Sequence, residues 1–386
     1  MVQARGTLAI TAAGMVSSLG ADVEVACAAA RAGLTQTSEG EYTVKDVEAE
    51  AMVPVTVHPV GRLTLGFAEV GRWVRLGSLA LRNLLKRSAW AGSGWERTAV
   101  LINLPGDFLP RSAFQALTRQ AAAKKEPPPE PEPVSYAGLQ PYYRAELVPK
   151  LLRAAGVAAS PAVHEVFFED ETGIVTVLRR AAELLRSGKV SRCLVAGVDS
   201  LLEPRWMEAA HVLRVMKSAT RPAGFMPGEG AAFLCVEETE RVRREERPIL
   251  ATVEGLVLQQ DASNRFASPP PDGRVLSEVI RASLQQAPGR CMGFYGDLNG
   301  DAVRAQEWGV AQLRLGRESV PDSVIVPAES FGETRAAYGF IAASMATQAF
   351  ARGYHPSETL LVWAATYSGA RGSFTLTRHP SQGAER

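Results

Sequence analysis

The sequence predicts a layered α/β fold built from two similar halves. Short apolar segments that suit strands alternate with amphipathic segments that suit helices through most of the 386 residues. A similar order of strands and helices then recurs in the later part of the chain, which indicates an internal duplication. Hydrophobic residues make up 46% of the sequence and charged residues 22%, the balance of a globular protein, so a disordered or fibrous chain is excluded.

Charge and cysteine content narrow the class of protein further. Lys and Arg number 42 against 41 Asp and Glu, and a net charge of +1 gives no long-range field for nucleic acid or an anionic membrane. The four cysteines are isolated, without zinc-type spacing, which is typical of free thiols in a reducing cytosol. No run approaches the roughly 18 apolar residues of a membrane helix, and the start, MVQARGTLAI, lacks a secretion signal. We therefore expect a cytoplasmic protein with no cofactor and no nucleic-acid or membrane partner.

The first half begins with a strand at residues 6–14. Its other predicted elements are a helix at Val23–Gly33, a helix through Leu76–Leu85, a strand in ERTAVLINLPGD, a helix at Tyr143–Ala155, a strand at Val163–Phe168, a helix at about 172–188, the strands RCLVAGVDS and GAAFLCVEE, and the charged helix ETERVRREER. Between about residues 119 and 140 the pattern dissolves into AAAKKEPPPEPEPVSYAG, whose prolines suit neither a helix interior nor a sheet. We expect an exposed insertion there.

The second half opens with the segment RPILATVEGLVLQQ. Its predicted elements are a helix at Val275–Gln286, the strand CMGFYGD, a helix at Ala302–Leu315, the strand SVIVPAE, a helix at Thr334–Arg352 and the strand ETLLVWAAT. The predicted boundary divides the chain into residues 1–250 and 251–386.

Four segments, in the right order, resemble the β-ketoacyl synthases of the thiolase-like superfamily. ITAAGMVSSLG is similar to the family's opening strand and turn, and AAELLRSGKVSRCLVAGVDSLLEP resembles the helix and strand that follow the nucleophile. GFMPGEGAAFLCVEE matches the segment with a gating aromatic, and SFGETRAAYGFIAASMATQAFARG resembles the late helix that begins with a catalytic histidine. The resemblance spans nearly the whole chain and implies a five-layer α-β-α-β-α fold with an acyl pocket between two similar halves.

The chemistry that the resemblance implies depends on one cysteine and two histidines. The cysteine, at a helix N-terminus, accepts the acyl chain as a thiolate, and the histidines support decarboxylation of a malonyl thioester. Counting back 17 positions from the glycine of RSG places Glu171 at the cysteine, and Glu333 stands at the second histidine. The first histidine falls on Asp297 if the loop is shortened, or on Gly293 without a gap. A carboxylate is a poor acyl acceptor and repels a malonyl carboxylate, so the sequence predicts no condensing activity.

Glu171, Asp297 and Glu333 admit more than one interpretation. Glu171 lies in an acidic helix start, where free backbone N–H groups and the helix dipole favour carboxylates without any chemistry. If the three acids converge in one pocket, as the resemblance places them, they form either an acid/base site or a metal site of oxygen ligands.

Two further residues complete the predicted pocket. Phe225 occupies the place of the gating aromatic, although an aromatic before a glycine-rich turn also suits core packing. Arg371 lies in YSGARGS, where the family has a glycine-rich loop that helps to form the oxyanion hole. Because buried carboxylates need compensation, Arg371 is expected either to pair with Glu171 or Glu333, or to turn outward and leave the acids solvated or bound to a cation.

Two functions fit this sequence. The first is a non-condensing ketosynthase-like subunit with a structural or regulatory role, such as chain-length-factor subunits have in polyketide systems. The second is an enzyme that reuses the carboxylate pocket for acid/base or metal-assisted chemistry on an acyl-type small molecule. An open cavity lined by the three acids would favour the enzyme, and a pocket closed by side chains would favour the subunit.

The expected partners are a second copy or a similar ketosynthase-like subunit, and an acyl carrier protein. The resemblance implies that the strand before the nucleophile helix pairs across a two-fold axis. Here that strand is His164–Phe168, whose bulky apolar residues would otherwise leave an exposed edge. Four basic residues follow one another in this order along the chain: Arg205, Arg214, Lys217 and Arg221. They are expected either to bind an acidic carrier protein or to form a solvated surface.

Overall fold

The computed structural model describes residues 8–46, 51–88, 94–130, 135–218, 221–287, 291–321 and 323–379. Ten strands form one continuous mixed sheet in the spatial order β10-β9-β11-β12-β8-β1-β7-β6-β4-β5. These strands are β1 (Leu8–Val16), β4 (Thr98–Leu104), β5 (Val163–Phe168), β6 (Arg192–Ser200), β7 (Glu229–Glu238), β8 (Ala251–Gln260), β9 (Cys291–Gly296), β10 (Val324–Ile325), β11 (Thr359–Ala365) and β12 (Ala370–Thr377).

The sheet contains the same topology twice. Strands β5-β4-β6-β7-β1 and strands β10-β9-β11-β12-β8 each follow the order third, second, fourth, fifth and first along the chain. The two sets join where β1 and β8 pair antiparallel, with Leu8 opposite Val253 and Ile10 opposite Ala251. The predicted duplication is therefore confirmed as a repeated strand order.

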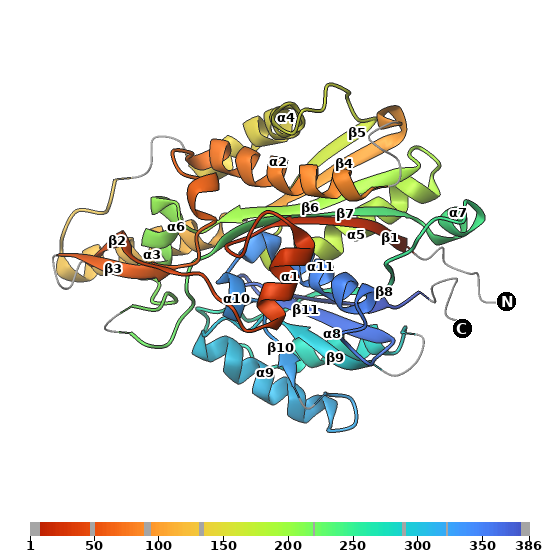
Figure 1. Cartoon of the computed structure of the whole chain (residues 1–386). Helices are drawn as coiled ribbons and strands as arrows, with labels where there is room; N and C mark the ends of the chain where they lie inside the picture. The colour runs from red at the N-terminus through yellow and green to blue at the C-terminus, as the bar shows by residue number, and fades with distance from the viewer. Residues whose placement is uncertain are drawn as a thin grey trace.

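Helices and sheet form five layers (Figure 1). Outside the first set of strands lie α2 (Glu69–Arg87) and α4 (Tyr136–Ala154). Between the two sets lie α1 (Val23–Arg31), α5 (Gly173–Arg186) and α11 (Tyr338–Ala351), and outside the second set lie α8 (Arg274–Leu284) and α9 (Ala302–Leu315). The other helices are α3 (Phe108–Lys124), α6 (Pro204–Val212), α7 (Thr239–Arg244) and α10 (Ala328–Phe331), and β2 (Ser38–Asp46) pairs with β3 (Ala51–Val57) in a separate hairpin.

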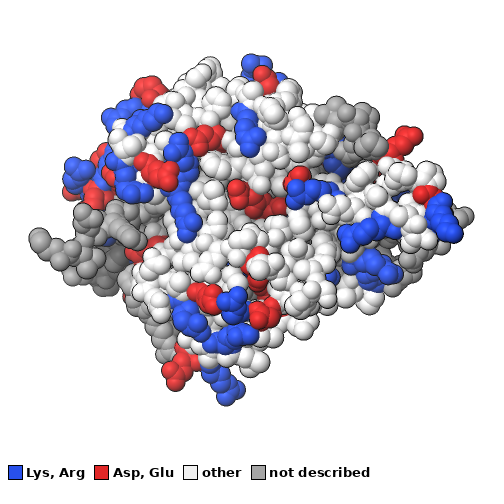
Figure 2. Space-filling model, turned by 180° about the vertical axis from the view of Figure 1, so that it is seen from behind, with Lys and Arg blue, Asp and Glu red and all other residues white. Residues whose placement is uncertain are grey.

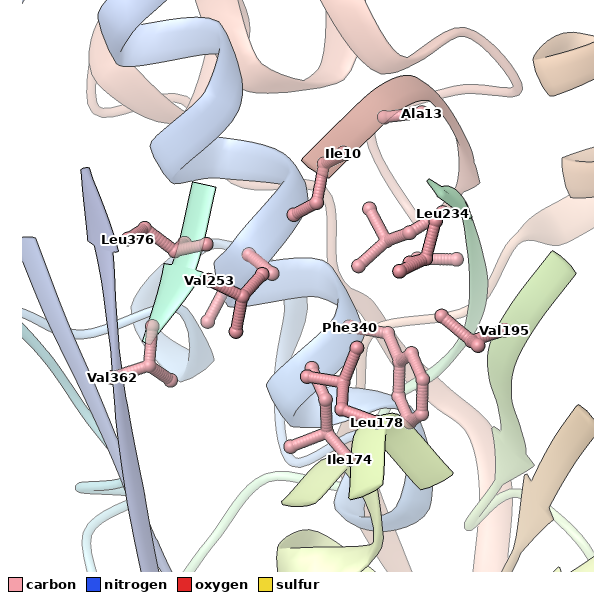
Figure 3. Close-up of a cluster of buried hydrophobic side chains, with 14 of the residues drawn as sticks. Ile10, Ala13, Ile174, Leu178, Val195, Leu234, Val253, Phe340, Val362 and Leu376 are labelled. Atoms are coloured by element: carbon pink, nitrogen blue, oxygen red, sulfur yellow. The ribbon is translucent and has the colours of Figure 1, made fainter. Parts of the chain in front are cut away.

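The central helices join the two halves of the sheet in one core. Figure 3 shows Ile174 and Leu178 of α5 and Phe340 of α11 lying between strands of the first set, such as β6 with Val195, and strands of the second set, such as β11 with Val362. Because α11 is enclosed by strands and helices, its sequence is apolar on all sides, and nearly every side chain in it is buried. The five-layer α-β-α-β-α fold is therefore the observed one.

The structure differs from the sequence prediction mainly around the proline-rich segment. Helix α3 extends to Lys124 and α4 begins at Tyr136, so the predicted insertion at 119–140 is narrower than expected. The alanine-rich end of α3 favours helix, and α4 accommodates Pro141 within its first turns. Residues 131–134 of that segment, and residues 6–7 of the predicted first strand, lie outside the described residues.

The molecular surface matches the balanced composition. Figure 2 shows Lys and Arg interspersed with Asp and Glu on the face seen from behind, with broad uncharged areas between them. Within the ranges that the structure describes, no helix combines the length and apolar character needed to cross a membrane.

Candidate functional site

The candidate site lies where strands of both halves end. After β5, the 3₁₀ turn η3 (Asp170–Thr172) carries Glu171 toward the start of α5. Asp297 directly follows β9, and Glu333 follows the short helix α10. The backbone of Glu333 is fixed in place, because its carbonyl accepts a hydrogen bond from the N–H of Gly228 at 2.9 Å. The carboxyl ends of parallel strands are where α/β folds place their functional side chains.

Arg304, in the first turn of α9, is the centre of the site. Its Nη2 lies 3.1 Å from Oε1 of Glu171, and its Nη1 lies 3.0 Å from Oδ1 of Asp297. The same Nη1 lies 3.5 Å from Oε2 of Glu333. All four side chains are at most 4% exposed. The structure thus brings the three predicted acids together around a guanidinium, and we call these four side chains the acid–arginine cluster.

Further hydrogen bonds orient the acids. Oδ2 of Asp297 accepts from the N–H of Ala365 at 2.9 Å, and Oε1 of Glu333 accepts from the N–H of Arg335 at 2.6 Å. The side-chain amide of Asn299 donates to Oε2 of Glu333. Of the two positions proposed for the first histidine, Asp297 is therefore the one whose side chain reaches the cluster. Gly293 lies within β9, packed against His355 and Leu360.

Burial shifts the pKa values of the cluster. Burial raises the pKa of Glu171 to about 8, although Arg304 opposes that rise. Burial also raises the pKa of Asp297 well above its usual range, again against the effect of Arg304. For Arg304, burial disfavours the charge, but Asp297 and Glu171 outweigh burial and raise its pKa. Because three ionised acids would exceed the single positive charge of Arg304, burial favours the protonated forms of Glu171 and Asp297.

Arg371 is buried, but it belongs to a different ion pair. Its Nε lies 2.6 Å from Oε1 of Glu307, and its Nη2 donates to Oε2 of the same residue at 3.0 Å. The expected pair with Glu171 or Glu333 is therefore wrong, and so is the outward-facing alternative. Arg304 and Glu307 are three residues apart on α9, so this helix supplies both the cation for the acids and the anion for Arg371.

Aromatic rings cover the cluster on the side of Arg304. The guanidinium of Arg304 lies 4.8 Å from the centre of the Tyr367 ring. Tyr367 belongs to a series of four rings with neighbouring ring centres 6.4, 6.2 and 6.0 Å apart, in the order Phe225, Tyr367, Phe266 and Phe108. We call this set the aromatic column. Phe225 is fully packed within it, and only Phe266, at 36%, is exposed to any large extent.

The cavity beside Arg304 is small. It lies between Arg304, Tyr367 and Arg371 and has a volume of about 10 Å³, which is room for about one water molecule. In the part of the chain that the structure describes, no group of three or more His, Cys, Asp or Glu side chains is placed to hold a metal ion. The guanidinium occupies the point at which the three carboxylates meet. The cluster can hold and release protons, but it contains neither a thiol nor an imidazole.

A second buried ion pair adjoins the cluster. Arg335 donates from Nε and Nη2 to the two carboxylate oxygens of Asp199 at 2.8 and 3.0 Å, which is a bidentate arrangement. Its guanidinium also lies 4.1 Å from the centre of the Trp206 ring. Asp170, whose pKa burial raises to about 6, lies 3.9 Å from Nε of Arg335. The turn η3, which carries Asp170 and Glu171, thus lies next to two buried guanidinium groups, those of Arg335 and Arg304.

Sequence reasoning missed Arg304, Asn299 and Glu307. The sequence did contain one signal for a missing arginine, because three converging acids require a cation. The helix that carries Arg304, α9, was also predicted with its correct bounds, Ala302–Leu315. Several arginines could have met that requirement, and only the contacts select Arg304. Which arginine faces the acids depends on how the second half of the sheet packs against η3.

Comparisons with known proteins agree with this fold. Residues 172–241 match the family model described as Beta-ketoacyl synthase, N-terminal domain. The spectinabilin polyketide synthase system protein NorC of Streptomyces orinoci is 34% identical over 118 residues, which cover 28% of this chain and 5% of that protein. The tetracenomycin polyketide synthase ketoacyl synthase beta subunit of Streptomyces glaucescens is 29% identical over 135 residues, which cover 32% of each protein. These matches span about a third or less of the curated relatives.

Solved structures match over almost the whole chain. A type II polyketide ketosynthase bound to a hexaketide, in complex with its acyl-carrier protein, gives a TM-score of 0.73 at 14% identity and covers 97% of this chain and 100% of that chain. The ishigamide ketosynthase/chain length factor gives 0.65 at 20% identity, with the same coverage. The fold is therefore that of the thiolase-like ketosynthases. The sequence matches to β-ketoacyl synthases and to a polyketide ketoacyl synthase subunit cover parts of the chain within this fold.

Proposed function

We propose that this chain is a non-condensing, chain-length-factor-like subunit that pairs with a cysteine-bearing ketosynthase subunit in polyketide or fatty-acid-type synthesis. The observation that carries the proposal is the side chain at the predicted nucleophile position. Glu171 is 1% exposed and is paired with Arg304 at 3.1 Å. A carboxyl group held in this way offers no thiolate to an acyl chain and no room for its thioester.

The closed surroundings support a subunit over an enzyme. The acids are buried, and the Tyr367 ring lies 4.8 Å from the Arg304 guanidinium. A substrate would have to displace this ring to reach the guanidinium from that side. The stability of the cluster then serves to hold together the ends of β5, β9 and α10, which is a structural role.

Strand β5 is the proposed contact with the partner subunit. It is the last strand of the sheet beside β4, and most of its side chains are only partly buried. A strand edge of this kind is completed when another strand pairs with it. For the carrier protein, Arg214 and Lys217 are exposed beyond the end of α6 and can face its acids. When the partner subunit is absent, we expect two copies of this chain to form a homodimer through the same edge.

Reconstitution tests the proposed function. The chain is co-expressed with a cysteine-bearing ketosynthase subunit from the same organism, and the condensation of malonyl units is measured for the purified pair. We expect activity to require both chains, to disappear when the partner's nucleophilic cysteine becomes Ala, and to remain within about twofold of wild type in Glu171→Gln. Failure of the two chains to co-purify would overturn the proposal.

One observation favours the alternative, an acid/base enzyme that uses the carboxylate pocket on an acyl-type small molecule. The pKa of Glu171, which burial raises to about 8, allows this carboxyl group to exchange a proton near neutral pH. In the reconstitution experiment, loss of activity in Glu171→Gln, with retention in the surface variant Glu318→Gln, would favour this alternative.

A further inference from the structure

We propose that a cavity at the starts of α2, α4 and α6 binds a small organic ammonium ion. The cavity has a volume of about 310 Å³, at the lower end of the range for small-molecule sites. None of the residues that line it belongs to the acid–arginine cluster. The inference goes beyond the proposed function and does not depend on it.

Aromatic side chains form much of the cavity wall. Trp73 lies edge to face with Tyr143, with ring centres 5.3 Å apart, and Tyr136 lies edge to face with Trp206 at 5.0 Å. Trp206 already has a cation on its ring, the guanidinium of Arg335 at 4.1 Å. The wall therefore has the composition that holds cations by their attraction to aromatic faces.

The charges around the cavity favour a positive ligand. Three carboxylates line it, from Glu69, Glu203 and Glu208, against one cationic side chain, Arg205. Glu203 pairs with Arg72 at 2.9 Å. Glu69 and Glu208 are exposed and form no ion pair with any other described residue. Their negative charge is available to a ligand at the mouth of the cavity.

A buried donor indicates a second feature of the ligand. Trp73 is 2% exposed, and its indole N–H has no hydrogen-bond partner in the part of the chain that the structure describes. Buried donors of this kind are normally satisfied. A ligand that combines an ammonium group with a hydroxyl or carbonyl oxygen would satisfy the indole N–H and also meet the acids. This combination defines the proposed class of ligand.

Choline is a suitable probe, because it carries a quaternary ammonium group and a hydroxyl oxygen. The neutral isostere 3,3-dimethyl-1-butanol has the same shape without the charge. Titration of the full chain is followed by calorimetry and by the fluorescence of the cavity tryptophans. We expect choline to bind with a Kd of about 1 mM or tighter, and the isostere to bind about tenfold more weakly.

Variants show whether the binding is at this cavity. Glu69→Gln and Glu208→Gln should each weaken choline binding several-fold, and Trp73→Phe, which keeps the ring and removes the N–H, should weaken choline more than tetramethylammonium. The matched control, Glu318→Gln, removes an exposed charge elsewhere and should leave the Kd unchanged. Equal binding of choline and its isostere, no binding of choline, or an equal effect of the control would overturn the inference.

Discussion

Replacing Arg304 with Met removes the cation that three buried carboxylates share. Its nitrogens lie 3.0, 3.1 and 3.5 Å from Asp297, Glu171 and Glu333, and the acids are at most 3% exposed. Removing one partner of a buried ion pair costs about 3 to 5 kcal/mol, because it leaves the other charge uncompensated. Methionine fills most of the volume of the arginine stem, so the loss of packing is small. We therefore expect Arg304→Met to lower the free energy of unfolding by about 3 to 5 kcal/mol at pH 8.

The pH dependence separates this electrostatic cost from a packing defect. At pH 5 the uncompensated acids can take up protons, so the loss should shrink, whereas at pH 8 the full loss should appear. Urea unfolding followed by tryptophan fluorescence measures both values. Arg314→Met is the control on the same helix, since this arginine is 42% exposed and pairs with an exposed Asp272 at 3.5 Å. That control should lose less than about 1 kcal/mol.

Neutralising the acids should restore the Arg304→Met variant. Glu171→Gln together with Asp297→Asn removes the charges that the arginine compensates, so the triple variant should recover most of the lost stability. If Arg304→Met costs no more than Arg314→Met, or costs the same at pH 5 and pH 8, the acid–arginine cluster does not stabilise the fold as argued.

Three further predictions concern the same region of the fold. Burial raises the pKa of Glu171 from 4.5 to about 8, so the stability contributed by this group falls as the pH rises from about 4.5 to 8. Glu171→Gln should remove that fall and raise the free energy of unfolding at pH 8 by about 2 to 4 kcal/mol. A pH profile of stability that is unchanged in this variant would contradict the raised pKa. Arg371→Met should lower the free energy of unfolding by about 3 to 5 kcal/mol. In double-mutant cycles, this loss should be much smaller when Glu307→Met is already present and should be unchanged when Glu171→Gln is already present. Gly197→Ala should lower stability by about 2 to 3 kcal/mol, because its Cβ would lie 2.4 Å from a backbone oxygen. Gly309→Ala, in open space on α9, should instead raise the melting temperature slightly, and equal effects at the two glycines would refute the close approach.

The strand bounds predicted most accurately are those of β5 and β6. Strand β6 is buried along its whole length, and such a largely apolar run can be recognised without its neighbours. The hairpin of β2 (SEGEYTVKD) and β3, and the strand β12 (ARGSFTLT), were missed. The polar or small residues that dominate β2 and β12 form strands because a neighbouring strand pairs with them, and the sequence does not show this pairing. Helix α4 was predicted too short, because the proline-rich insertion was expected to extend to about residue 140, whereas the helix begins at Tyr136.

Part of the candidate site could likewise be predicted from the sequence, and part of it could not. The resemblance placed Glu171, Asp297 and Glu333 together, and the structure brings them together. The compensating arginine could not be identified from sequence, because the contact between Glu171 and Arg304 joins residues 133 positions apart. Arg371 was a reasonable expectation from its loop, but Glu307 lies closer to it. Ion pairs between distant segments depend on packing, and local patterns do not determine that packing.

Intact-protein mass spectrometry tests the central claim, that the position of the nucleophile carries no acyl chemistry, most directly. The purified chain is incubated with acetyl and malonyl thioesters and then weighed, with Glu171→Gln treated in parallel. We predict an unmodified mass for both proteins and no release of carbon dioxide from the malonyl thioester, because Glu171 is buried against Arg304 and offers no thiolate. A stoichiometric acyl adduct on the wild type that is absent from Glu171→Gln would contradict the account.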